Sequence, residues 1–327
     1  MRIRTLAKEL AYNILNVAGF AKVRRARLAG GVVILTYHSF SESSYGISGD
    51  SIPAARFASQ LRHLKKHYDV VGLREALKWL GDHETSDRPP RRRPAVVVSI
   101  DDGFSDNFST MWPVVDALKV PVTVFLATDF LDSGRTPWPT LLNAIIRATE
   151  AEQMSYPFSA SLRTPEERAA VAAHLKATWR KLGAHERLAA LEKLRRHVGA
   201  NNVKTIPPLT WGEVHEMRRN GVTFGSHTVY HGLLPHIAPA EAASELVDSK
   251  TRIEKELQEP CDWLAYPNGD FDQGVIGLAR QAGYRAALTQ ERGVNRPGSE
   301  VMALRRIQVP HDESLGCFAC RASLSAI

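Results

Sequence analysis

The sequence lacks the features that mark disulfide-stabilised or membrane-spanning proteins. Its 327 residues include three cysteines, too few for a disulfide framework. No apolar run approaches the roughly 18 residues that a membrane-spanning helix needs. The first residues contain no apolar region of adequate length and no evident small-residue cleavage site, so we do not expect a secretory signal.

The sequence also lacks a surplus of charge outside its first 27 residues. Of 42 Lys and Arg and 35 Asp and Glu, residues 1–27 carry seven and one, so the other 300 residues hold 35 and 34. These 300 residues are nearly neutral, so they have no net positive charge to attract nucleic acid. Nucleic acid is therefore not an expected partner. Cys317 and Cys320 have metal-type spacing, but no second ligand pair accompanies them, and a structural zinc site needs four ligands.

Residues 1–30 form a basic segment with apolar residues at helical spacing. The apolar positions are Ile3, Leu6, Leu10, Ile14 and Val17. Two interpretations remain open: a helix packed on the domain, or an amphipathic helix lying on an anionic membrane. We expect a cytoplasmic protein, and the second interpretation adds peripheral contact with the inner face of the cytoplasmic membrane.

Residues 31–327 are predicted to form one α/β domain. Strand-like runs alternate with helical segments, which is typical of a parallel sheet or barrel. Residues 133–205 differ because they are mostly helical and charged and lack strand-like runs, so we interpret them as a helical insertion. The expected strands lie near residues 32–37, 95–100, 121–127, 222–226, 263–266, 285–289 and 304–309.

The notable polar residues follow directly after these strands. VVVSI precedes Asp101 and Asp102, VTFGS precedes His227 and leads on to His231, and VVILTY precedes His38. In a βα barrel the carboxyl ends of the strands meet on one face, where active sites lie. On a helical turn, the i, i+4 histidines could share one metal ion with one of the aspartates. The other aspartate would then be free to act as a general base.

Two of these motifs resemble those of the polysaccharide deacetylases (NodB-homology, carbohydrate esterase family four). SIDDGFSDN resembles their T-F-D-D-G motif, SHTVYH their H-[S/T]-x-x-H motif, and AYPNGDFD their third motif. The resemblance covers roughly residues 31–310 apart from the insertion. It implies a distorted (β/α)7 barrel and metal-dependent hydrolysis of acetyl groups on sugars, usually with Zn²⁺.

The resemblance also implies residue roles. It makes Asp101 the general base and makes Asp102, His227 and His231 the ligands of a divalent metal. The backbone N–H of Tyr266 would hold the oxyanion. The third motif usually begins with an arginine that orients the base, but no arginine precedes Tyr266 here, and Arg306 is the candidate replacement.

Two histidines compete as the general acid. The usual family order favours His311, which follows Val309 and Pro310. We favour His38, because it ends an unbroken buried strand, whereas Pro310 is expected to turn His311 outward. The family branch that acts on exopolysaccharides and surface glycans also carries its acid histidine in an early Tyr-His strand, which this chain resembles.

The predicted function is removal of N-acetyl groups from an amino-sugar-containing glycan, either a polysaccharide or a lipid-linked precursor. One alternative is a deformylase or amidohydrolase acting on a small nucleotide-linked or lipid-linked sugar. Another is a glycan-binding pseudoenzyme, but the intact Asp-Asp and His-xxx-His sets count against it, because binding alone does not require a base beside a metal.

Overall fold

The computed structural model describes residues 28, 30–40, 51–81 and 93–324. The predicted N-terminal segment therefore lies almost entirely outside the described residues, and neither interpretation of it is addressed by the structure. Among the helices that the structure describes, none combines the length and the apolar character needed to span a bilayer.

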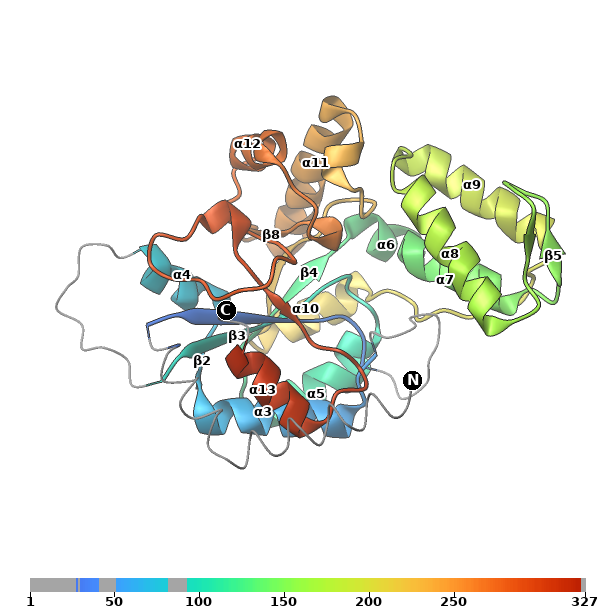
Figure 1. Cartoon of the computed structure of the whole chain (residues 1–327). Coiled ribbons are helices and arrows are strands. Elements are labelled where there is room, and N and C mark those ends of the chain that lie inside the picture. The colour runs from blue at the N-terminus through green and yellow to red at the C-terminus, as the bar shows by residue number, and fades with distance from the viewer. Residues whose placement is uncertain (1–27, 29, 41–50, 82–92, 325–327) are drawn as a thin grey trace.

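The centre of the molecule is a parallel sheet curled into a distorted barrel, as predicted (Figure 1). In the described part of the chain it has eight strands, and along its main path the order is β10-β1-β3-β4-β7-β8-β9, with β2 paired to β3. The strands are β1 (Val32–Tyr37), β2 (Asp69–Val70), β3 (Ala95–Ile100), β4 (Val122–Leu126), β7 (Thr223–Ser226), β8 (Trp263–Ala265), β9 (Ala286–Leu288) and β10 (Ile307–Gln308).

A short backbone contact closes the barrel between the first and last strands of this order. Leu304, which precedes β10, forms a parallel bridge with Leu288 of β9. The N–H of Thr289 donates to the carbonyl of Leu304, and the N–H of Leu304 donates to that of Ala287. The chain then continues into β10, which pairs with β1 on its other side.

Strand alternation separates the inside of the barrel from the outside. On β1, Val33, Leu35 and Tyr37 belong to the outer core, while Val32 and Ile34 pack within the barrel. Because side chains alternate along a strand, the inner series of β1 continues to Thr36 and His38. The same alternation on β3 runs from Ala95 through Val97 and Ser99 to Asp101, so the strands themselves aim both polar residues inward.

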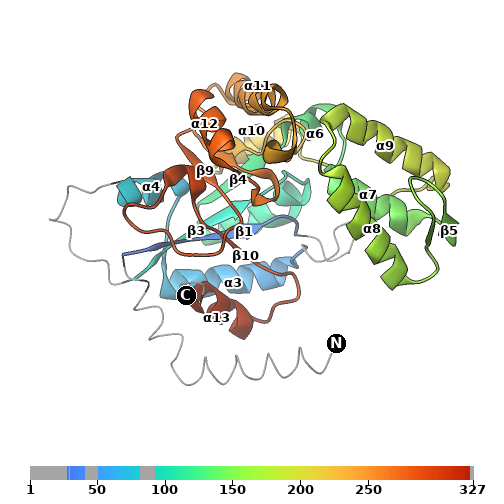
Figure 2. The same ribbon diagram turned by 45° about the horizontal axis from the view of Figure 1, so that its top comes forward.

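Helices cover the outside and one end of the barrel (Figures 1 and 2). The apolar residues of α4 (Leu73–Gly81) join the inner cluster, whereas the other covering helices pack on the outer one. These are α3 (Ala54–His67), α5 (Trp112–Leu118), α6 (Thr128–Ser133), α10 (Trp211–Arg219), α11 (Pro239–Leu257), α12 (Gln273–Gln281) and α13 (Leu315–Leu324). Cys317 and Cys320 both lie on α13 as free thiols.

The start of α10 shows how the local sequence sets a helix boundary. Thr210 accepts a hydrogen bond from the N–H of Glu213, and the Glu213 carboxylate accepts from the N–H of Thr210. This is a capping box, which a threonine followed three residues later by a glutamate favours. Gly221 follows the helix with a φ of 92°, a backbone conformation that suits glycine and stops the helix before β7.

The residues between α6 and α10 project from one side of the barrel and have their own apolar cluster (Figure 2). They contain the helices that the sequence predicts and also a short antiparallel hairpin that it does not. The elements are α7 (Trp138–Ala148), β5 (Gln153–Met154), β6 (Ala160–Ser161), α8 (Pro165–Trp179) and α9 (Ala184–His197). Because α7 follows the β4–α6 connection, this unit begins beside the strand ends where the polar residues gather.

Candidate active site

A pocket of about 280 Å³ opens at the carboxyl ends of the strands. It is lined by His38, Asp101, Asp102, His227 and His231, which the sequence singles out. The structure therefore brings together residues from β1, β3 and β7 that are as far as 193 positions apart in the chain.

Asp101 and Arg306 form a buried ion pair beneath this pocket. Both guanidinium NH2 groups of Arg306 donate to the Asp101 carboxylate, each at 2.8 Å, and its Nε donates to the carbonyl of Thr289 at 2.7 Å. Arg306 is 0% exposed and Asp101 1%. Burial alone would raise the pKa of Asp101, but the charge of Arg306, assisted by its hydrogen bonds, lowers that pKa to about 2. Arg306 thus has the contact expected of a residue that orients Asp101.

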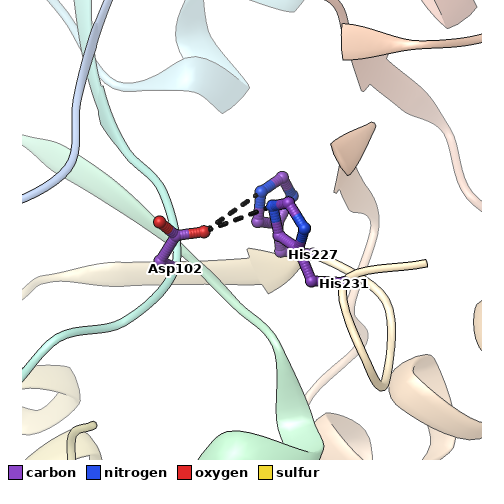
Figure 3. Close-up of side chains that lie close together, drawn as sticks. All are labelled: Asp102, His227 and His231. Carbon is purple, nitrogen blue, oxygen red and sulfur yellow. Dashed lines mark ion pairs between the residues drawn. The ribbon is translucent and has the colours of Figure 1, made fainter. Parts of the chain in front are cut away.

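Asp102, His227 and His231 form the second group, shown in Figure 3. The Asp102 Oδ1 lies 3.5 Å from the His227 Nε2 and 3.6 Å from the His231 Nε2. These distances exceed those of hydrogen bonds. They match the separation of about 3.4 Å between ligand atoms around a tetrahedral zinc ion with bonds near 2.1 Å. The donor set and its spacing therefore fit a divalent metal, with room for further ligands.

One hydrogen bond fixes the orientation of His227. Its Nδ1 lies 2.7 Å from the carbonyl of Ala265, which can only accept, so Nδ1 carries the proton. The Nε2 lone pair is then directed at Asp102, as a metal ligand requires. Burial, with smaller contributions from neighbouring charged groups, lowers the pKa of His231 well below its ordinary value, which favours the neutral imidazole that a metal ligand must be.

The two histidines do not lie on a helical turn, and that part of the prediction is wrong. β7 ends at Ser226, and the following loop has left-handed backbone at Thr228 (φ 67°) and His231 (φ 55°). The loop still brings the two rings to within 4.8 Å of each other. Left-handed backbone at residues other than glycine costs of order 1–3 kcal/mol, so surrounding contacts must hold this conformation.

Glu245 of α11 supplies those contacts. Its Oε2 accepts hydrogen bonds from the backbone N–H groups of Val229 and Tyr230, at 2.8 and 2.9 Å. Glu245 is 3% exposed, and its Oε1 would lie 2.8 Å from a Cβ placed on Gly232, so a side chain there would displace the carboxylate. The sequence does not reveal Glu245, because nothing within α11 distinguishes the carboxylate that faces a loop 15 and 16 residues earlier.

His38 lies in the pocket and His311 does not. His38 is half-buried, and its backbone carbonyl accepts a hydrogen bond from the Asn107 side chain at 3.0 Å. The His311 side chain is 45% exposed, near Asp312, and its carbonyl accepts from Arg56 outside the pocket. The placement agrees with the preference for His38, whose role as the acid stays a prediction.

The predicted role of Tyr266 is wrong. Its backbone N–H donates to the carbonyl of Leu288 in the β8–β9 pairing, so it is not available to an oxyanion. Its ring packs in the outer core and its hydroxyl donates to the carbonyl of Met302. Strand alternation could have predicted the position of the ring, because Trp263 and Ala265 face inward and Tyr266 must then face outward.

Asn268 occupies the pocket rim instead. It lines the pocket, its backbone is left-handed (φ 57°), and its side chain donates to Asp270 at 3.1 Å. Gly269 beside it could carry no side chain, because a Cβ there would lie 2.3 Å from the backbone nitrogen of Gln290. The projecting helical unit adds further lining residues that the sequence did not predict, among them Thr140, Asn143 and Lys176.

Comparison with known proteins gives a consistent result. The family model described as Polysaccharide deacetylase matches residues 88–287, which include both aspartates and both site histidines but neither His38 nor Arg306. Among curated proteins, YxkH of Bacillus subtilis (strain 168), which carries the name of a polysaccharide deacetylase, is 21% identical over 279 residues. The alignment covers 84% of this chain and 70% of the relative.

Two solved structures share this fold over most of their length. Streptococcus pyogenes deacetylase PplD, in complex with acetate, aligns with a TM-score of 0.60 at 18% identity, covering 88% of this chain and 96% of its own. IcaB from Ammonifex degensii aligns with a TM-score of 0.59 at 18% identity, covering 90% and 97%. At these identities the alignments show a shared fold.

Proposed function

The chain belongs to the polysaccharide deacetylase family, and on that premise we propose that it hydrolyses N-acetyl groups on an amino-sugar-containing glycan with the help of a divalent metal, Zn²⁺ by family resemblance. The family supports deacetylase chemistry in general. The proposal adds the type of acetyl bond, the metal and the roles of individual side chains.

One observation carries the proposal: a buried carboxylate fixed by an arginine stands next to a separate Asp-His-His group in a single pocket. Asp101 belongs to the first set, and Asp102, His227 and His231 form the second. A pocket that only binds sugar has no need for both. A divalent ion held by the second set would act as a Lewis acid, polarising the amide carbonyl and lowering the pKa of water.

The residues of the chain account for the proton transfers. Asp101 is ionised at neutral pH because Arg306 lies against it, and it accepts the proton of the water that attacks the acetyl carbon. His38, on the same pocket, donates a proton to the sugar nitrogen as the carbon–nitrogen bond breaks. The products are acetate and a free amine on the sugar.

The test is acetate release from an N-acetylated glucosamine oligosaccharide by the metal-loaded protein. We expect Asp101→Asn to lower kcat by about 10²–10⁴-fold, because an amide cannot accept the proton. Asp116→Asn is the matched control, since Asp116 is exposed on α5 and pairs with Lys119. Near-normal turnover by Asp101→Asn would remove Asp101 from the mechanism.

The same assay separates the alternatives. Formate release from an N-formyl sugar without acetate release from the acetylated one would favour a deformylase. Glycan binding without release of either acid would favour a binding protein. We further propose that residues 1–27, outside the described residues, contact an anionic membrane on its cytoplasmic side, which suits a lipid-linked precursor as substrate.

A further inference from the structure

A second and larger cavity adjoins the catalytic pocket. It measures about 620 Å³ and lies where α7 and α8 pack together in the projecting helical unit. Asn143 and Lys176 line both cavities, so the two meet at these residues. The catalytic pocket alone, at about 280 Å³, is slightly smaller than the roughly 300–1,000 Å³ found for ligand sites, so the second cavity extends the space that a substrate could occupy.

The charged side chains that line this groove in the described part of the chain all have the same sign. Arg147, Arg163, Arg168 and Lys176 line it, and no Asp or Glu of the described residues does. Glu152 lies 3.1 Å from Arg163 at the outer end, but both side chains are at least 60% exposed, so this pair offsets little of the charge. Arg168 donates to the carbonyls of Ile146 and Thr149 at the end of α7, which fixes its guanidinium at the groove wall.

Two of the cations that line the groove, Arg168 and Lys176, belong to α8. Arg168, Ala172 and Lys176 are four residues apart, so they lie on one face of the helix. An α-helix rises 1.5 Å per residue, so Arg168 and Lys176 are about 12 Å apart along the axis of α8. Of the two, Lys176 also lines the catalytic pocket. Ile146 and Ala172 are buried and give the groove an apolar floor between the charges.

We propose that this groove binds a phosphate group carried by the acetylated substrate, next to the sugar in the catalytic pocket. The inference rests on the proposed function of that pocket. Arginines bind phosphate through paired hydrogen bonds, and a phosphate monoester has more charge and more acceptor oxygens than a carboxylate. The apolar floor suits hydrocarbon attached to the phosphate better than a hydrated uronate chain.

The experiment compares dissociation constants, measured by calorimetry, for N-acetylglucosamine and N-acetylglucosamine 1-phosphate. We expect the phosphate to bind at least about tenfold more tightly, with a preference that weakens as salt is added. Arg147→Gln and Lys176→Gln should each remove most of that preference. Lys181→Gln, an exposed cation of the same unit outside both cavities, is the matched control and should keep it.

Two further ligands identify the source of the anion. Tighter binding of the decyl phosphodiester of N-acetylglucosamine than of the simple phosphate would indicate a lipid-linked substrate, and equal binding would indicate a free sugar phosphate. A disaccharide of N-acetylglucosamine and glucuronic acid that binds as tightly as the phosphate would overturn the choice of phosphate.

Equal affinity for the neutral and phosphorylated sugars, or a phosphate preference that survives Arg147→Gln and Lys176→Gln, would overturn the inference. Acetate release from the same compounds is measured separately. If none of these compounds released acetate, the proposed function would be overturned. The affinities measured by calorimetry would still test whether the groove binds phosphate.

Discussion

Asp101 and Asp102 are neighbours in the chain but have different surroundings. Asp101 continues the inner face of β3 and meets Arg306, while Asp102 has left-handed backbone (φ 76°) and turns towards His227 and His231. Among the described residues, six other than glycine have positive φ. Two of them cap helix ends, and the other four are Asp102, Thr228, His231 and Asn268. Strained backbone is thus concentrated around the pocket, as at many functional sites.

The ion pair of Asp101 and Arg306 predicts a large effect on stability. In Arg306→Ala the Asp101 carboxylate would be buried without its partner, which typically costs about 3–5 kcal/mol in the free energy of unfolding. The neighbouring Arg305 is 55% exposed and lies 3.9 Å from Glu291, so Arg305→Ala should change stability by no more than about 0.5 kcal/mol. Denaturant unfolding of both variants measures the difference, and equal stability would show that the pair is unimportant for the fold.

The choice of general acid is a second prediction for single residues. We expect His38→Ala to lower kcat by about 10²–10⁴-fold on correctly folded, metal-loaded protein. His311→Ala should leave kcat near normal, because His311 lies outside the pocket. A large fall for His311→Ala alone would reverse the assignment.

At the scale of elements, α11 holds the loop that follows β7. Glu245 reaches from the helix to two N–H groups between the site histidines, so it acts on the metal site through the loop. The packing of α11 against β7 sets the distance over which this carboxylate can act. The conformation of the loop is therefore decided by a helix that contributes no ligand itself.

Removing this carboxylate should weaken metal binding without removing a ligand. We expect Glu245→Ala to reduce metal affinity by about 10–100-fold, as supporting contacts of metal ligands typically do. Glu245→Gln should restore part of it, because an amide oxygen still accepts hydrogen bonds. Asp248→Asn, exposed on the same helix, is the control, and His227→Ala is the reference for loss of a ligand. Unchanged affinity in Glu245→Ala would contradict this role.

At the scale of the whole molecule, the barrel and the projecting helices together line the catalytic pocket. Arg180, just after α8, pairs with Asp270 in the loop after β8 at 2.6 Å, and Asn268 on the pocket rim bonds to the same carboxylate. Glu241 of α11 accepts a hydrogen bond from the N–H of Ala184 at the start of α9. These contacts hold the helical unit against the mouth of the barrel, so it is placed to take part in substrate selection.

The proposed membrane contact is a prediction for the complete chain. Residues 1–27 carry a net charge of +6, so deleting them should release the protein from anionic vesicles and leave activity on a soluble substrate intact. Binding of the full-length protein should weaken as salt is added. Vesicle flotation measures both effects, and failure of the full-length protein to bind at low salt would favour the packed-helix interpretation.

The sequence by itself determined the order of the seven main strands and of the helices between them, the inward direction of Asp101 and His38, and the capped start of α10. These features depend on short-range rules: hydrophobic periodicity, strand alternation and hydrogen bonds between residues three apart. The same alternation, applied to β8, would have placed Tyr266 outside the barrel. The position of the motifs next to strand ends predicted that two histidines and an aspartate meet, whereas the choice of Asp102 over Asp101 was what the family resemblance implied.

Only the tertiary structure decided which groups meet across long stretches of chain. Arg306 reaches Asp101 because the segment before β10 closes the barrel against β9, 205 residues from its partner. Glu245 supports the histidine loop, and the cations of α7 and α8 gather beside the pocket, because separate helices pack on one end of the barrel. No local pattern encodes such contacts, since their formation depends on the packing of the whole core, in which each element restricts the positions of the others.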